Sequence, residues 1–349
     1  MSREVPEFPI TARSLYSYIV ETLQNFRARS TIGLLKVWSL LALPLVCSSQ
    51  DKPVIPGGRG PLQLEQVIAP ESLTTSLTTL ATQRRWDEVL NAALLGLSEK
   101  PGDPILHYWT GVARFHQQDF VRAVLSLRSA EKLGLDTAAF HEALGLTYYA
   151  IHQHVLFLQQ MEAAIRADPG GPMPHHYLGR YYEHDVNDYL KAISYFEKAL
   201  GRDPADYKSL HFRAFCLQML GRDEEARAGY EAAIRRIEAG GSTFGWPYQK
   251  LAELLIPTDL QAALQYARQA VLLEPAVEAN HLIVAKVYES RGDFDAAIRE
   301  CLDAARLKPN DPAIRYVLVR LYKKKGDSAD AAEQLKVHEK LRSIYISKQ

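Results

Sequence analysis

The sequence has few cysteines and no excess of charge of either sign. Cys accounts for 3 of its 349 residues, and no two of them stand in a C-x-x-C spacing. This excludes a disulfide scaffold and a thiolate zinc site. Lys plus Arg and Asp plus Glu both total 41, which leaves a formal net charge of zero. Because a neutral chain has no overall field that concentrates polyanions, we expect no nucleic-acid partner.

Motifs that mark catalysis are also missing. The sequence contains no G-x-x-x-x-G-K-[ST] phosphate loop, no G-x-S-x-G elbow and no H-E-x-x-H zinc motif. The glycines of Gly57–Gly60 follow no strand-like run, so they are interpreted as part of a linker. We therefore predict that the chain is not an enzyme and that it has no catalytic, cofactor-binding or metal-binding residues.

No apolar run in the sequence is long enough to cross a bilayer comfortably as a helix. Val37–Val46 is a largely apolar run of ten residues that follows three basic residues, a pattern typical of a secretory signal. We predict an N-terminal leader over residues 1–50, with the signal-like segment at 31–49 and cleavage near Ser48 or Ser49. Residues 51–69 are rich in Pro and Gly and are predicted to form a flexible linker.

Other interpretations of this segment stay open. It could be retained as an anchor near the membrane, form a lipoprotein modified at Cys47, or pack as a buried helix, and the true start of translation could lie downstream of residue 1. If the segment is a signal, the protein is exported and is periplasmic, secreted or envelope-associated. Otherwise it is cytoplasmic or membrane-anchored.

The rest of the chain repeats with a period of 34 residues. The length of 349 residues already favours two domains or a repeat array over a single core. The same residue types recur at this step in Gly111 and Gly145, Ala263, Ala297 and Ala331, Tyr288 and Tyr322, and Gly292 and Gly326. A repeat of this length predicts a stack of similar units, each of which buries its apolar face against its neighbours.

Each unit has the pattern of two helices. Apolar and small residues three and four apart mark a first helix in Tyr177–Glu183 and a second in Ala192–Leu200. The turn before a second helix is clearest in Gly292–Ala297, where Gly ends one helix and acidic residues begin the next. Proline follows the second helix, as at Pro309, and stops it.

The pattern resembles that of the tetratricopeptide repeat family. The clearest matches are Leu144, Gly145, Tyr148, Ala164 and Pro169; Leu178, Gly179, Tyr182, Ala192, Phe196, Ala199 and Pro204; and Tyr288, Gly292, Ala297, Ala304 and Pro309. The resemblance implies an all-α fold, a right-handed α-solenoid of about eight helix-turn-helix repeats over residues 70–349. The repeats would start near residues 70, 104, 138, 172, 207, 244, 278 and 312.

Small and polar residues in the array have structural interpretations. Gly111 and Ala297 are expected to let helix backbones approach closely. Cys216 and Cys301 are too far apart along such an array to form a disulfide and are expected in its core. The histidines at residues 107, 141 and 175 recur at the period of 34, and His281 stands in the equivalent position of the seventh repeat. This recurrence favours packing or surface histidines over a metal site.

The family resemblance also implies a concave groove, lined by the first helices, as the partner-binding surface. The predicted groove residues are Tyr108, Val112, Phe115, Leu146, Tyr149, His176, Arg180, His211, Phe215, Tyr248, Lys286, Tyr316, Arg320, Lys323 and Lys324. They change from aromatic to basic along the chain, and residues 312–349 hold nine Lys or Arg against four Asp or Glu. An extended segment that is apolar at one end and acidic at the other would suit this groove. A solvated basic face without a partner is the alternative.

We therefore expect a non-catalytic scaffold that binds a protein or an extended peptide in this groove. One alternative is a lipid-anchored or accessory component of a cell-envelope assembly or secretion machine, in which the array joins subunits edge to edge. Another is the regulatory or substrate-platform part of an enzyme. In either case the N-terminal segment could hold the array close to a membrane.

Overall fold

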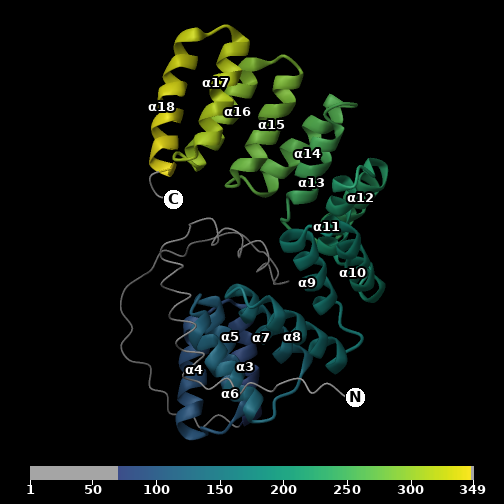
Figure 1. The fold of residues 1–349 in the computed structure, drawn as a ribbon, viewed down its shortest axis with the longest axis vertical. Helices are drawn as coiled ribbons and strands as arrows, with labels where there is room; N and C mark the ends of the chain where they lie inside the picture. The colour runs from purple at the N-terminus through teal and green to yellow at the C-terminus, as the bar shows by residue number, and fades with distance from the viewer. Residues whose placement is uncertain (1–69, 347–349) are drawn as a thin grey trace, which may run out of the picture. The chain divides into compact units, whose positions relative to one another are not determined.

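The computed structural model describes residues 70–346, and within this range every regular element is a helix (Figure 1). The predicted all-α fold of helical hairpins is confirmed. The predicted leader at 1–50, its signal-like segment at 31–49 and the linker at 51–69 lie outside the described residues, so that division of the chain stays a prediction. None of the described helices is long and apolar enough to cross a bilayer.

The described helices form eight successive hairpins. Their first helices are α3 (Pro70–Thr82), α5 (Pro104–His116), α7 (Ala138–Ala150), α9 (Met173–Tyr181), α11 (Tyr207–Met219), α13 (Trp246–Leu255), α15 (Glu278–Ser290) and α17 (Pro312–Lys325). Their second helices are α4 (Trp86–Glu99), α6 (Phe120–Lys132), α8 (His154–Ala167), α10 (Tyr189–Arg202), α12 (Asp223–Gly240), α14 (Leu260–Leu273), α16 (Phe294–Leu307) and α18 (Ser328–Ile346).

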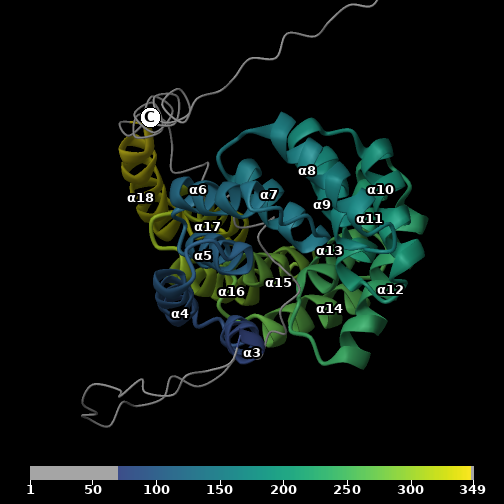
Figure 2. The same ribbon diagram turned by 90° about the horizontal axis from the view of Figure 1, so that it is seen from below.

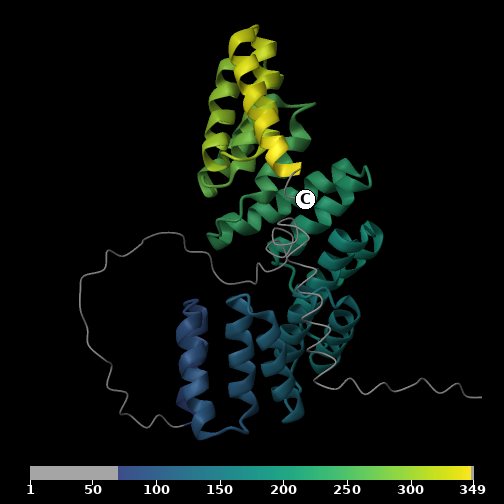
Figure 3. The ribbon, with the colours of Figure 1, turned by 60° about the vertical axis from the view of Figure 1, so that its left-hand side comes forward.

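The described residues divide into two compact units, with the boundary inside α8. The first unit covers residues 70–160, and its helices stand side by side in blue in Figure 3. Its core includes the fully buried Leu77, Val89 and Ala93. The second unit covers residues 161–346, and Figure 2 shows its helices α9–α14 following one another in chain order. Its core contains Phe196 and Leu251.

The turns between helices follow the local chemistry of the sequence. The Asp103 carboxylate accepts hydrogen bonds from the backbone N–H of Ile105 and Leu106 at 2.9 and 3.3 Å, which caps the start of α5. Asp293 caps α16 in the same way through the N–H of Ala296 at 3.0 Å. Gly292, just before it, has a φ of +79°, a left-handed conformation that glycine adopts without strain.

Small residues mark close helix contacts, as predicted. A Cβ atom on Gly111 would lie 2.5 Å from the side chain of Leu127 on the partner helix. A Cβ atom on Gly179 would lie 2.6 Å from the ring of Phe196. The expected burial of Cys216 and Cys301 is also confirmed, because neither side chain is accessible to solvent.

One first helix departs from the regular pattern. After Tyr181 the backbone of α9 continues as a π-helical turn, η1 (Tyr182–Val186), which ends at Asn187 in the left-handed conformation with φ of 57°. A π-turn holds one extra residue and often accompanies a specialised site. Glu183, the second residue of this turn, is buried.

Candidate functional site

The predicted groove residues differ widely in their exposure. Seven of them expose less than a tenth of their surface: Phe115, Leu146, Tyr149, His176, Arg180, His211 and Tyr248. Three are half-buried, namely Tyr108, Val112 and Phe215. Five are exposed: Lys286, Tyr316, Arg320, Lys323 and Lys324. The accessible part of the predicted set therefore lies mainly on α15 and α17.

The aromatic residues of the first unit are packing contacts. The ring of Phe115 meets Phe120 edge to face, with ring centres 5.7 Å apart. Tyr149 packs in the same way on Phe157, at 5.3 Å. Burial, with a smaller contribution from the Glu142 carboxylate, raises the pKa of Tyr108 to about 12. These rings leave little surface for a partner, so their partner-binding role stays a prediction, and a substitution there would also disturb the core.

A buried ion pair lies where α9 passes into the π-turn. The Arg180 guanidinium donates a hydrogen bond of 2.5 Å to the Glu183 carboxylate, and both side chains are almost inaccessible. The same guanidinium lies 3.5 Å above the ring centre of Phe212 on α11. Burial raises the pKa of Glu183, although the charge of Arg180 opposes that rise. Arg180 therefore ties two successive first helices together through a charge and a ring.

His176 and His211, both in the second unit, are buried. Nδ1 of His176 lies 2.8 Å from the Ser209 hydroxyl and 3.6 Å from the Asp206 carboxylate. The same nitrogen faces both partners and Ser209 is fully buried, so this trio does not have the geometry of a nucleophile with its base. Burial lowers the pKa of His176 and lowers that of His211 further, with the Arg180 charge acting in the same direction. Both are predicted groove residues, and their partner-binding role stays a prediction.

Ion pairs link charged side chains on successive first helices. Lys250 and Lys286 both donate to the carboxylate of Glu253, at 3.2 and 2.9 Å. Arg320 and Lys324 both contact the carboxylate of Glu289 at 2.8 Å. Phe215 on α11 continues the row, since the Lys250 ammonium lies 5.6 Å from its ring centre. We call this set the charged strip: Phe215, Lys250, Glu253, Lys286, Glu289, Arg320 and Lys324.

The two carboxylates of the charged strip are held in their ionised form. Burial alone would raise the pKa of Glu253, but Lys286 and Lys250 lower it below its ordinary value. Lys324 and Arg320 do the same for Glu289. Four basic side chains then stand against two carboxylates, so the charged strip has a net charge of +2. The predicted basic end of the groove is thus half neutralised by its own glutamates.

Sequence reasoning missed Glu253 and Glu289, although a signal for them was present. Each glutamate follows a lysine by three residues, at Lys250–Glu253 and again at Lys286–Glu289. The recurrence of this spacing in two successive first helices places both acids on the face of the lysines.

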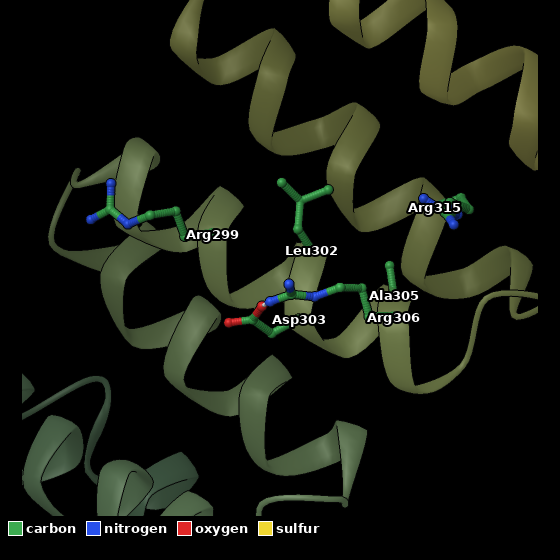
Figure 4. A pocket seen from close by; sticks show the side chains of 6 residues that line it. All are labelled: Arg299, Leu302, Asp303, Ala305, Arg306 and Arg315. Carbon is green, nitrogen blue, oxygen red and sulfur yellow. Dashed lines mark ion pairs between the residues drawn. The ribbon is translucent and has the colours of Figure 1, made fainter.

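A separate pocket of about 480 Å³ opens beside α16. Its lining residues are Arg299, Leu302, Asp303, Ala305, Arg306 and Arg315 (Figure 4). Figure 4 shows Arg306 alongside Asp303, with which it forms an ion pair, while Arg299 and Arg315 extend to either side. None of these residues was among the predicted site residues.

Part of the chain matches a known repeat family. The tetratricopeptide repeat family model matches residues 183–241 and 258–312. Tetratricopeptide repeat protein 37 of Xenopus laevis is 24% identical over 202 residues, which cover 55% of this chain and 12% of that protein. Superkiller complex protein 3 of Mus musculus is 28% identical over 170 residues, which cover 46% of this chain and 11% of that protein. The chain thus spans only about an eighth of the length of these relatives.

Solved structures share the fold. The APC/C hetero-tetramer Cut9–Hcn1 has a chain that matches with a TM-score of 0.63 and 14% identity, over 72% of this chain and 49% of that one. PilW, a type IV pilus biogenesis factor, matches with a TM-score of 0.53 and 18% identity, over 62% of this chain and 98% of that one. At these identities the likeness concerns the fold alone. The family model thus identifies tetratricopeptide repeats at residues 183–241 and 258–312, and the stacked hairpins have the fold of that family.

Proposed function

We propose that the protein is a non-catalytic scaffold that holds a partner protein through an extended segment laid along the charged strip. The tetratricopeptide repeat fold is consistent with a protein-interaction scaffold. The name of the mouse relative assigns that protein to a complex. A protein partner for this chain agrees with that name.

The observation that carries this proposal is the continuity of the charged strip over four successive first helices. Its basic groups are ion-paired but remain partly exposed, and Lys286, Arg320 and Lys324 each leave about half of the side chain accessible. A partner carboxylate can therefore approach these basic side chains at little cost in desolvation, because exposed ion pairs are individually weak. The net charge of +2 favours an acidic segment, and Phe215 offers an apolar contact at one end.

Two other functions were left open by the sequence: an accessory component of an envelope assembly or secretion machine, and the regulatory or platform part of an enzyme. No specific observation among residues 70–346 favours either of them over the scaffold.

The scaffold is tested by selecting extended peptides displayed on phage against the full chain, at low and at high salt. We expect the selected peptides to be enriched in Asp and Glu next to an apolar residue, and their binding to weaken at high salt, because screening reduces the attraction between exposed charges. Selection of apolar peptides whose binding ignores salt would contradict the charged strip as the binding surface.

For the N-terminal segment we propose export of the protein, supported by the apolar run at Val37–Val46 and the basic residues before it. A reporter that is active only outside the cytoplasm, fused after residue 60, should give signal. A reporter that is well expressed but silent would rule out export.

A further inference from the structure

Histidines at one position of the repeat make a recurring contact with the loop before their helix. Nε2 of His107 lies 2.9 Å from the carbonyl oxygen of Pro101, and Nε2 of His281 lies 3.2 Å from that of Pro275. A carbonyl oxygen only accepts hydrogen bonds, so Nε2 of His281 bears the hydrogen in the tautomer that makes this contact. The other ring nitrogen, Nδ1, then has a lone pair that can bind a cation.

The partner of that second nitrogen is charged at His281 and neutral at the histidine of an earlier repeat. Nδ1 of His141 lies 2.7 Å from the side-chain amide oxygen of Gln160, and its Nε2 lies 2.6 Å from the Asp136 carboxylate. Nδ1 of His281 lies 2.9 Å from a carboxylate oxygen of Glu300. Both partners of Nδ1 stand 19 residues after their histidine, on the second helix of the hairpin. In the tautomer with the hydrogen on Nε2, the Nδ1 lone pair of His281 and the Glu300 carboxylate are two electron-pair donors that face the same point, as the ligands of a cation do.

A third ligand lies beside this pair. The ligand atoms of His281, Glu300 and Asp303 all lie within 4.8 Å of one another. A tetrahedral zinc ion, with bonds of about 2.0–2.1 Å, holds its ligand atoms about 3.3 Å apart. The distance of 2.9 Å between Nδ1 of His281 and the Glu300 carboxylate is already close to this spacing. A modest rotation of the Asp303 carboxylate would then bring the third ligand atom to the same spacing. The earlier repeat has Ala163 where Asp303 stands, so it offers no third ligand.

The surroundings of the three groups suit a bound metal. The Pro275 carbonyl fixes the tautomer of His281, as a second hydrogen-bond partner does for most metal-binding histidines. Arg306 holds the Asp303 carboxylate in the same manner. Asp303 also lines the pocket of about 480 Å³ (Figure 4), so water has access to the remaining coordination positions.

We propose that Nδ1 of His281 and the carboxylates of Glu300 and Asp303 bind a divalent first-row transition metal ion, with Zn²⁺ as the representative and water as the remaining ligand. The ion would join α15 to α16 on residues that do not belong to the charged strip. The sequence interpretation of His281 as a packing residue overlooked this site because two of its ligands come from the second helix, which spacing within the first helix does not reveal.

The test uses the full chain and compares Zn²⁺ binding by titration calorimetry in the wild type, Glu300→Gln and Asp303→Asn. Glu300→Gln reproduces the His141–Gln160 pairing that the chain already contains, so it should fold, which circular dichroism verifies. We expect Zn²⁺ to raise the melting temperature of the wild type and each variant to bind at least about tenfold more weakly. Mg²⁺ should cause no shift, because imidazole is a poor ligand for it.

His141→Gln is the matched control, since it removes a histidine from the same repeat position and should leave the affinity for Zn²⁺ unchanged. The proposal is overturned if the wild type binds no Zn²⁺, or if Glu300→Gln and Asp303→Asn bind it as tightly as the wild type. Either result would mean that His281 simply hydrogen-bonds to Glu300.

Discussion

The Lys286 ammonium donates a hydrogen bond of 2.9 Å to the Glu253 carboxylate on the preceding first helix. The next step along the chain repeats this relationship, because Glu289 receives Arg320 and Lys324 from the following helix. Exposed ion pairs contribute only about 0–1 kcal/mol each to stability. These ion pairs therefore matter chiefly for recognition. They keep a row of basic side chains extended, ionised and partly hydrogen-bonded on one face of the array.

Glu253→Gln tests this interpretation. The substitution removes one internal carboxylate from the charged strip and releases Lys250 and Lys286, so acidic peptides should bind several-fold more tightly. The free energy of unfolding should change by less than about 1 kcal/mol. Fluorescence anisotropy with a selected peptide, together with a denaturant melt, measures both effects. Glu224→Gln removes an exposed acid of α12 and serves as the control, and equal affinities in the two variants would contradict the prediction.

Gly179→Ala should destabilise the second unit. The added methyl group would lie 2.6 Å from the Phe196 ring, and overpacking of this kind costs about 1–3 kcal/mol. Gly201→Ala is the matched control, because nothing lies within 4 Å of the added atom and alanine favours a helix by about 0.5–1 kcal/mol. Urea denaturation of both variants should give opposite signs. A Gly179→Ala protein as stable as the wild type would show that the contact with α10 is looser than described.

Acidification should weaken the fold. Burial, with smaller effects from Arg202 and Lys198, lowers the pKa of His175 to about 4, and those of His176 and His211 are lowered as well. The unfolded chain then binds more protons than the folded one once the pH falls below about 6.5. The stabilisation is complete above this pH and is lost as the pH falls towards 4, by on the order of 1 kcal/mol per pH unit for His175.

Denaturant melts at pH 7.5, 6.5 and 5.5, values bracketing the ordinary histidine pKa of about 6.5, measure this slope. His175→Phe retains an aromatic ring next to Tyr195, on which His175 stacks, and should flatten the slope. A free energy of unfolding that does not change with pH in this range would show that the histidines are hydrated.

Arg180→Ala should be more damaging than any substitution in the charged strip. It leaves the buried Glu183 carboxylate without its counter-charge and removes the guanidinium above Phe212, a combined loss of about 3–5 kcal/mol. The double variant Arg180→Met/Glu183→Gln should recover part of this loss, since no buried charge remains. Thermal and urea melts compare the three proteins. Equal stability of the single variant and the wild type would mean that water reaches the pair.

The 34-residue period and the small residues that recur with it were sufficient to predict the fold. Gly111 and Gly179 lie at close helix contacts, where a larger side chain would clash with the neighbouring helix. The need for a small residue at these positions is visible in the sequence. The caps and turns were equally predictable, as the aspartate at Asp293 after the glycine at Gly292 shows. Such features are local, so one stretch of sequence contains all the information that they need.

The exposure of the groove residues was much less predictable. Phe115 and His211 stand at inward positions of their helices, yet neighbouring rings cover both. Burial depends on the sizes of side chains from several helices, which spacing within one helix does not report. The pairing of Lys286 with Glu253 likewise joins residues 33 apart in the chain. The π-turn at Tyr182–Val186 had no signal in the repeat pattern.

The affinity of one selected acidic peptide for three forms of the full chain tests the account most directly. The forms are the wild type, Lys286→Glu/Arg320→Glu in the charged strip, and Lys336→Glu/Lys340→Glu, which makes the same change of charge on exposed residues of α18. If partners lie along the charged strip, the first double variant should bind at least about tenfold more weakly, a loss of about 1.4 kcal/mol, and the second should bind like the wild type. Equal losses in both would mean that only net charge attracts the peptide, and no loss in the first would place the binding surface elsewhere.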